Sequence, residues 1–426
     1  MAADLHNKSQ KVTLAAPSER VAPTEPKARM GAVDAVRGFA LFGVLLVNMY
    51  NFGADAPEWT GFLDSAFYQT MHALFETKSL RLFSLLFGFG FALQLSKVLT
   101  SAGNFWSLYL RRLCILFAFG MAHALFFDGD ILMEYAMLGL ILIAFYKVTS
   151  RILLVLSFLL LAVFPVANLV RTESAIDLAE QWEDSLPLAE LRVNHPYLGT
   201  PMEVFEENAF AIPPHIWSNL HGPESSLVIF SMFLLGLYIG RRRILHDVTA
   251  HQPLIRRVFA WGLGVGAIGA LTEWWLNRKY GYAVFTESTA SDGIQFLGDM
   301  LFAYGSTCLA LGYGAGIVLL AQRPAGQKLL RPLQNIGRMA LTAYLSGTLI
   351  FTTLFYGWGF GQLFLLGPAV TTFYAVLFFV VLLLACNWWL ARFRFGPAEW
   401  LWRSLTYLKW QPLRRQQGLV RNHPTP

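Results

Sequence analysis

Charged residues are scarce in this sequence of 426 residues. Asp, Glu, Lys and Arg make up 14% of it, whereas 55% of the residues are hydrophobic and 15% are aromatic. A soluble globular domain has about 25% charged residues, so this chain lacks the polar surface that a soluble or disordered protein needs. The composition therefore predicts an integral membrane protein.

Cysteine is rarer still, and Cys114, Cys308 and Cys386 lie apart inside apolar runs. This spacing fits neither a disulfide framework nor a zinc site, so we expect no metal. The Walker, HExxH and GxSxG motifs are also missing. Gly88-Phe89-Gly90 follows no strand, so it predicts close helix packing rather than dinucleotide binding.

Ten apolar segments approach or reach the 17 to 25 residues that a helix needs to cross a bilayer. We expect an all-α polytopic membrane protein with about ten transmembrane helices. The short Asp128-Gly129-Asp130 turn makes the third and fourth an antiparallel hairpin. The segments are 35–54, 80–99, 110–127, 130–147, 152–170, 226–241, 257–276, 296–320, 336–356 and 368–391.

The distribution of lysine and arginine predicts the orientation of these segments. With the N-terminus in the cytosol, 27 of the 33 basic residues fall on the cytosolic side, and 21 of the 27 acidic residues fall outside. Because cytosolic loops are enriched in basic residues, both termini are expected in the cytosol. The net charge of +6 does not indicate nucleic acid, because the basic residues follow one membrane face.

The same pattern divides the chain into five regions. The acidic loop contains ten acids against one arginine, and the last region pairs aromatic with basic residues, which is typical of an interfacial helix. The regions are a disordered cytosolic tail (1–30), an N-terminal five-helix bundle with the candidate site (31–171), an acidic extracytoplasmic loop (172–225), a C-terminal five-helix bundle (226–395), and an interfacial helix with a basic cytosolic tail (396–426).

Polar groups within membrane spans are costly, so each is a candidate for function. His123 is the strongest, because a neutral imidazole can act as a general base near neutral pH. Asp130, across the turn, could orient that imidazole or cap the next helix. Asn48 and Arg81 lie at similar depth and would stabilise a developing oxyanion. We expect these four side chains to share one cavity, although purely structural hydrogen bonds remain an alternative.

Arginines form a second candidate group. Arg81 could instead bind an anion or pair with Glu134 or Glu76. At the cytosolic face, arginines either anchor helix ends by snorkelling or contact the phosphates of a cytosolic donor. The cytosolic candidates are Arg37, Arg111, Arg112 and Arg338.

Five motifs in order, covering about residues 30 to 410, suggest a family. They are Asp34-Ala-Val-Arg37-Gly with Asn48; Leu82-Phe-Ser-Leu-Leu-Phe-Gly88; His123-Ala with Gly129-Asp130-Ile-Leu; Gly337-Arg338-Met-Ala-Leu-Thr342-Ala-Tyr344; and Gly396-Pro397-Ala-Glu399-Trp400. The chain thereby resembles the YeiB family of bacterial inner-membrane proteins, whose C-terminal part is a domain of unknown function.

This family is distantly similar to membrane acyltransferases such as the lysosomal heparan glucosaminide acetyltransferase. The resemblance implies an acyl-CoA donor, such as acetyl-CoA, on the cytosolic side, with Arg37 as the helix-opening arginine. It also implies a small-molecule, glycan or lipid-linked acceptor on the far side. The O-acetylating branch has a catalytic histidine about where this chain has Asn48, which cannot accept a proton at neutral pH. Either His123 takes that role or the chemistry differs.

Two classes of function therefore stand beside each other. The first is a membrane acyltransferase with His123 as base. The alternative is a transporter, a channel or a small-molecule-binding membrane protein without group transfer; a scaffold is a third reading. Membrane lipids are expected partners, nucleic acid is not, and oligomer formation is left open.

The charge asymmetry yields a topology that can be tested. Reporter fusions at residue 200 and at the C-terminus should report opposite sides of the membrane, because ten helices return the chain to the cytosol. Fusions that report the same side would contradict the assignment.

Overall fold

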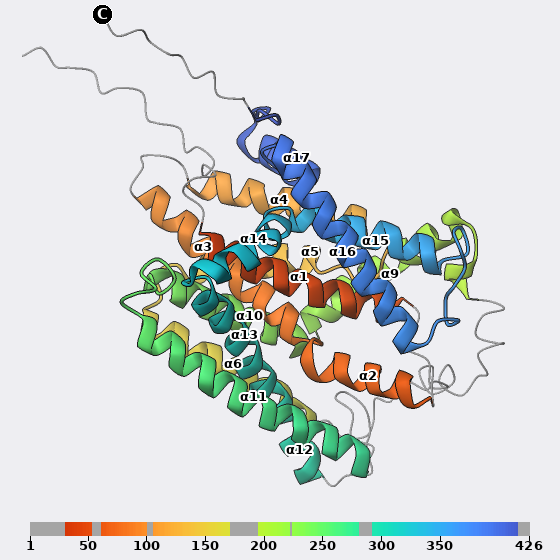
Figure 1. Cartoon of the computed structure of the whole chain (residues 1–426), viewed down its shortest axis with the longest axis horizontal. Helices are drawn as coiled ribbons and strands as arrows, with labels where there is room; N and C mark the ends of the chain where they lie inside the picture. Colours follow the sequence, from red (N-terminus) through yellow and green to blue (C-terminus); the bar gives the residue numbers. More distant parts are fainter. Residues whose placement is uncertain are drawn as a thin grey trace, which may run out of the picture.

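The computed structural model describes residues 30–52, 61–99, 105–170, 195–221, 224–280 and 292–415. Every named element in these ranges is a helix, so the all-α class is confirmed (Figure 1). The predicted N-terminal tail and much of the predicted acidic loop lie outside the described residues. The α-helices are α1 Gly31–Asn51, α2 Phe62–Leu74, α3 Lys78–Leu99, α4 Phe105–Ala124, α5 Leu132–Leu142, α6 Ser150–Val170, α9 Pro201–His221, α10 Glu224–Arg241, α11 Gln252–Tyr280, α12 Asp292–Met300, α13 Ser306–Leu320, α14 Pro324–Arg338, α15 Ala340–Phe355, α16 Pro368–Arg392 and α17 Pro397–Tyr407.

Each of the ten predicted segments overlaps one of these helices. Six stretches of the described chain are long and apolar enough to span a membrane: Gly31–Asn51, Phe62–Ser96, Ser150–Ala167, Gln252–Leu276, Gly293–Leu320 and Pro368–Arg392. Three further apolar helices are shorter, at Leu132–Phe145, Ser226–Arg241 and Ala340–Phe355. The one predicted segment not among these nine stretches is 110–127, which overlaps α4 and contains Arg111 and Arg112. The chain is thus an all-α polytopic membrane protein.

Helix α1 lies in the middle of the molecule (Figure 1). It packs against α3 from its own half of the chain and against α13, α14, α15 and α16 from the other. The backbones of α1 and α14 lie so close together that only glycine fits at two positions. A Cβ on Gly38 would lie 2.2 Å from the Leu333 carbonyl oxygen, and a Cβ on Gly337 would lie 1.9 Å from the Asp34 carbonyl oxygen. The two halves therefore share one core around α1.

Helix α3 makes a similarly close contact with α10. A Cβ on Gly88 would lie 2.0 Å from the carbonyl oxygen of Phe233, and one on Gly236 would lie 2.0 Å from that of Leu85. A Cβ on Gly90, by contrast, would have no other atom within 4 Å. The expectation of close packing at Gly88-Phe89-Gly90 is therefore confirmed for the first glycine, whose missing side chain admits the neighbouring backbone.

Helices α15 and α17 cap one another at their N-termini. The buried Glu399 carboxylate accepts hydrogen bonds from the backbone N–H of Leu341 at 2.7 Å and of Thr342 at 3.1 Å. The Thr342 hydroxyl donates to the other Glu399 oxygen at 2.6 Å and accepts from the N–H of Ala398 at 3.0 Å. Burial raises the pKa of Glu399, and these hydrogen bonds oppose that rise. The helix predicted after the tenth span thus positions the start of α15.

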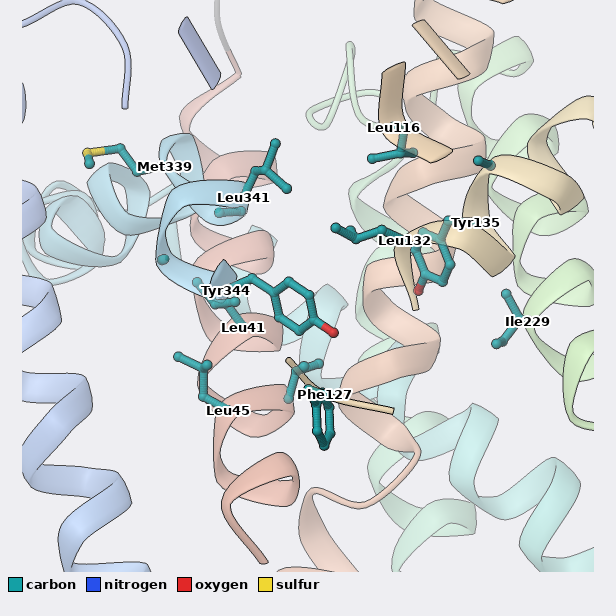
Figure 2. Close-up of a cluster of buried hydrophobic side chains, with 14 of the residues drawn as sticks. Leu41, Leu45, Leu116, Phe127, Leu132, Tyr135, Ile229, Met339, Leu341 and Tyr344 are labelled. Carbon is teal, nitrogen blue, oxygen red and sulfur yellow. The ribbon is translucent and has the colours of Figure 1, made fainter. Parts of the chain in front are cut away.

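The hydrophobic core draws on both halves of the chain. Figure 2 shows Leu41 and Leu45 of α1 on one side, facing the region of Phe127 and Leu132, with Tyr344 of α15 between them. All five side chains are buried. This core encloses the candidate site.

The contrast between the two glycines of α3 predicts unequal effects of alanine. Gly88→Ala should lower the free energy of unfolding by about 1–3 kcal/mol, as overpacking does, and lower the melting temperature of the detergent-purified protein. Gly90→Ala is the matched control and should change stability by less than about 1 kcal/mol. Equal melting temperatures for the two variants would disprove the close contact between α3 and α10.

Candidate functional site

His123, Asp130 and Thr348 form a continuous hydrogen-bonded chain. The Nδ1 atom of His123 lies 2.7 Å from Oδ1 of Asp130, and its Nε2 atom lies 2.7 Å from Oγ1 of Thr348. The three residues are 5%, 2% and 3% exposed. Because an ionised carboxylate only accepts hydrogen bonds, Nδ1 carries the imidazole proton and Nε2 accepts from the Thr348 hydroxyl.

Asp130 is held by the helix that it precedes. Its Oδ2 atom accepts the backbone N–H of Met133 at 2.8 Å, in the first turn of α5. The residue therefore fulfils both roles that the sequence suggested, with one oxygen on the helix N-terminus and the other on His123. The short turn between α4 and α5 brings the two side chains together, as expected, and locks the carboxylate toward the ring.

Thr348 was not singled out in the sequence, and its hydrogen bond is unusual for a helical threonine. A threonine in a helix commonly bonds the carbonyl one turn earlier. Among the described residues, Thr70, Thr272, Thr307, Thr352, Thr353, Thr372 and Thr406 donate to the carbonyl four residues earlier. The hydroxyl of Thr348 faces the Nε2 atom of His123 instead, so it belongs to the site.

Tyr344 lies one turn before Thr348 on the same face of α15. Its ring centroid is 4.8 Å from that of His123, and Figure 2 shows its hydroxyl pointing away from α15. Among the described residues no group completes a hydrogen bond of good geometry to this buried hydroxyl. The side chain of Asn48 and the backbone of Ile131 lie beside it, and the charge of Asp130 acts on it. Tyr344 thus adds an available O–H donor beside His123.

Arg81 is directed to a different group of helices. Its guanidinium donates to the Phe302 and Ala303 carbonyls of η4 (Leu301–Gly305, a π-helix) and to the Thr307 hydroxyl of α13. The ion pair with Glu134 or Glu76, one of the two readings that the sequence left open for Arg81, is not formed among the described residues. A π-helix disturbs the regular helical hydrogen bonds, and the arginine satisfies the carbonyls at that point. The structure thus brings Asn48, His123 and Asp130 together around Tyr344. Arg81 binds other helices and does not join them.

Glu134 has a partner of its own in the neighbouring helix. Its Oε1 atom accepts a hydrogen bond from the Ser226 hydroxyl of α10 at 2.6 Å. Tyr135, the next residue, shares a hydrogen bond of 2.6 Å with Ser84 of α3. These contacts tie α5 to its neighbours and stabilise the helix that Asp130 caps.

The four arginines predicted at the cytosolic face lie near helix ends. Arg37 pairs with Asp34 at 2.9 Å and donates to the Gly337 carbonyl at 3.4 Å, beside Arg338. The guanidinium of Arg112 lies 4.2 Å from the Trp402 ring, and Arg37 is near enough for the two charges to repel. Arg111 donates to the Thr406 carbonyl at 3.0 Å. Arg338 donates to the side-chain oxygen of Asn335 at 3.3 Å. Each arginine thus has a contact within the chain, and the charges of Arg37 and Arg112 lie near one another.

No set of metal ligands accompanies the site in the described part of the chain, where no three His, Cys, Asp or Glu side chains are grouped to hold an ion. The chemistry that the residues can perform is proton transfer at Nε2 of His123 and hydrogen-bond donation from Tyr344 and Asn48.

An all-helical membrane bundle with a buried His–Asp–Thr chain is the class of protein that the fold and the site define. Comparison with known proteins then places the chain. A family described as "Protein of unknown function (DUF418)" matches residues 239–409. The chain is 30% identical over 416 residues to the uncharacterized protein YxaH of Bacillus subtilis (strain 168), covering 92% of this chain and 98% of YxaH.

Two further relatives cover nearly the whole chain. The uncharacterized protein YeiB of Escherichia coli (strain K12) is 28% identical over 393 residues, covering 88% of this chain and 95% of YeiB. An uncharacterized 39.9 kDa protein in the amylase 3' region of Bacillus acidopullulyticus is 27% identical over 389 residues, covering 90% of this chain and 96% of that protein. The chain belongs to the YeiB family, as its motifs indicated.

The double role of Asp130 predicts a stability effect. Asp130→Ala should lower the free energy of unfolding by about 1–3 kcal/mol, because it leaves the buried Met133 N–H and His123 Nδ1–H without acceptors. Asp130→Asn keeps one acceptor oxygen and should have an intermediate effect on the melting temperature. Asp128→Ala, at an exposed position of the same turn, is the control; an Asp130→Ala variant as stable as this control would contradict the assignment.

Proposed function

We propose that this protein is an acyltransferase of the bacterial inner membrane that uses an acyl-CoA such as acetyl-CoA. It moves the acyl group from the cytosolic thioester to a hydroxyl or amine of an extracytoplasmic or lipid-linked acceptor. The observation that supports this best is the His123 ring, held between the Asp130 carboxylate and a hydroxyl at 2.7 Å on each side. A general base needs this geometry, with one nitrogen oriented by an acid and the other facing the proton to be removed.

His123 supplies the base. With Nδ1–H donating to Asp130, Nε2 takes the proton of the attacking hydroxyl or amine as the new bond to the acyl carbon forms. Asp130 stabilises the imidazolium that results, and the N–H of Met133 keeps the carboxylate in place. The same imidazolium then donates its proton to the departing thiolate.

Tyr344 and Asn48 are suited to stabilise the oxyanion. Attack on a thioester carbonyl places negative charge on its oxygen, and prearranged hydrogen-bond donors lower the energy of that state. The buried Tyr344 hydroxyl is an available donor next to the His123 ring. Asn48 lies beside that hydroxyl and can donate from its amide. Tyr344 takes the role that the sequence suggested for Arg81.

The donor would be held at the other end of the same helices. From the helical rise, Arg112 lies about 17 Å from His123 along α4, and Arg37 lies about 17 Å from Asn48 along α1. Arg37 and Arg112, whose charges lie near one another, offer positive charge for the phosphates of a coenzyme A thioester. Arg338 directly follows Gly337, whose carbonyl accepts from Arg37, and would add to this charge. A long pantetheine arm between α1 and α4 would then bring the thioester to the base.

Substrate entry requires a movement, because the His123, Asp130 and Thr348 side chains are almost completely buried. The Phe127 ring, 6.0 Å from that of His123, is part of this cover. A closed site excludes water, which strengthens its electrostatic interactions and prevents hydrolysis of the thioester.

His123→Ala should lower acyl transfer by about 10²–10⁴-fold, the usual contribution of a general base. The assay follows radiolabelled acetyl-CoA into the lipid and glycan extracts of inverted membrane vesicles, whose cytosolic face is accessible. Acetyl-CoA affinity, measured by calorimetry on the purified protein, should stay unchanged. Arg37→Ala should show the opposite pattern, with weaker affinity and a smaller loss of turnover.

The oxyanion donors provide a graded comparison. Tyr344→Phe should lower turnover by about 10²–10³-fold, as loss of an oxyanion donor does, and Asn48→Ala should lower it less than His123→Ala. Full activity in His123→Ala would return the histidine to a structural role. Failure of the wild-type protein to transfer any acyl group would favour the transport alternative.

A further inference from the structure

We propose that Thr348 is the first acyl acceptor, so that the reaction passes through an acyl-threonine ester on α15. This inference rests on the proposed acyltransferase function and identifies the nucleophile within the same site. It makes the reaction a double displacement, in which the coenzyme A thiol leaves before the final acceptor reacts.

The geometry at Thr348 is that of an activated nucleophile. Its Oγ1 atom lies 2.7 Å from Nε2 of His123, and the ring is oriented in turn by Asp130 at 2.7 Å. A nucleophile, a base and an orienting group within hydrogen-bond reach define this arrangement, whatever the fold. The Thr348 hydroxyl is also the group that already faces the base, so no other hydroxyl needs to displace it for the first step.

The helix presents this hydroxyl to the site rather than to its own backbone. Thr352, one turn later, donates its hydroxyl to the Thr348 carbonyl at 2.9 Å, in the manner usual for helical threonines. Thr348 makes its hydrogen bond across the bundle, to a residue 225 positions away in the sequence. Two buried threonines on one face of α15 thus differ in chemical environment, and Thr348 alone faces a base.

Tyr344 completes the arrangement from one turn earlier. Residues four apart lie on the same helix face, and both side chains contact His123: the Tyr344 ring centroid is 4.8 Å from that of His123, and Thr348 Oγ1 is 2.7 Å from Nε2. A carbonyl carbon bonded to Oγ1 would place its oxygen near the buried Tyr344 donor. The donor would serve both tetrahedral intermediates, since each has the same carbon attached to Oγ1.

The proposed steps balance. First, Nε2 of His123 takes the Thr348 hydroxyl proton while Oγ1 bonds to the thioester carbon; the C–S bond then breaks, and the thiolate leaves with the proton from His123. Second, Nε2 takes a proton from the acceptor hydroxyl or amine while that group bonds to the acyl carbon. The C–Oγ1 bond breaks, and the proton returns to Oγ1.

A covalent carrier suits a buried site between two membrane faces. Donor and acceptor approach from opposite sides in the proposed reaction, and a threonine ester removes the need for both to be bound at once. Thr348 is 3% exposed and His123 is 5% exposed, so water is kept from the ester until an acceptor enters. The intermediate should therefore persist long enough to be isolated when no acceptor is present.

The test is to incubate the purified protein with radiolabelled acetyl-CoA without an acceptor and to locate the acetyl group by peptide mass spectrometry. We expect an acetyl ester on Thr348 in the wild type and in Thr348→Ser, which retains a hydroxyl. Thr348→Val should form no adduct and should lower transfer into vesicle lipid and glycan by more than about 10³-fold. His123→Ala should also lack the adduct.

Thr352→Val is the matched control, because it removes a buried hydroxyl of the same helix that faces no base. It should label and transfer like the wild type, and its melting temperature shows how much a lost hydroxyl affects folding. Transfer by the wild type without an adduct, or with Thr348→Val as active as Thr352→Val, would overturn the acyl-threonine and leave acyl transfer intact. A wild-type protein that neither labels nor transfers would overturn both.

Discussion

Helices that end inside an apolar bundle impose the constraint on which this structure depends. The first N–H groups and last C=O groups of a helix have no partner within it, and no water reaches them in a membrane interior. Acids therefore satisfy buried N-termini and arginines satisfy C-termini, in agreement with the helix dipole. Three carboxylates accept backbone N–H groups at helix starts: Asp64 at α16, Asp130 at α5 and Glu399 at α15. Two arginines donate to backbone carbonyls at or after helix ends: Arg241 to carbonyls after α5, and Arg111 to a carbonyl at the end of α17.

This constraint also separates structural charges from available ones. Arg81 is buried because the π-helix η4 needs a donor for its carbonyls, and Glu399 is buried because α15 needs an acceptor. Asp130 differs, since capping α5 uses one oxygen and leaves the other for His123. The Asp130 carboxylate thus stabilises the fold with one oxygen and orients the proposed catalytic base with the other.

Much of the fold could be read from composition and periodicity. Each of the ten apolar segments overlaps a helix, because a long apolar run in a membrane satisfies its backbone hydrogen bonds within itself when it is helical. Helices α2, α9 and α14 were not predicted. Their polar residues form hydrogen bonds with elements that are distant in the sequence. The Asp64 carboxylate of α2, for example, accepts the N–H of Ala369 at 2.9 Å. Such distant partners cannot be recognised from the neighbouring residues of the sequence. The motifs identified the family because residues such as Gly337 and Glu399 make contacts that few side chains could replace.

Within the site, the sequence placed His123 and Asp130 on the two sides of a short turn between helices, so that the carboxylate could orient the imidazole or cap the next helix. It also determined the membrane class, through the shortage of charge. The packing of the helices was needed to show that Thr348 and Tyr344 complete the site and that Arg81 does not. The reason is physical: a threonine in a helix ordinarily bonds its own backbone, and an arginine in a membrane bonds whatever carbonyls are exposed. Which partner each finds depends on how α3, α4 and α15 pack in space.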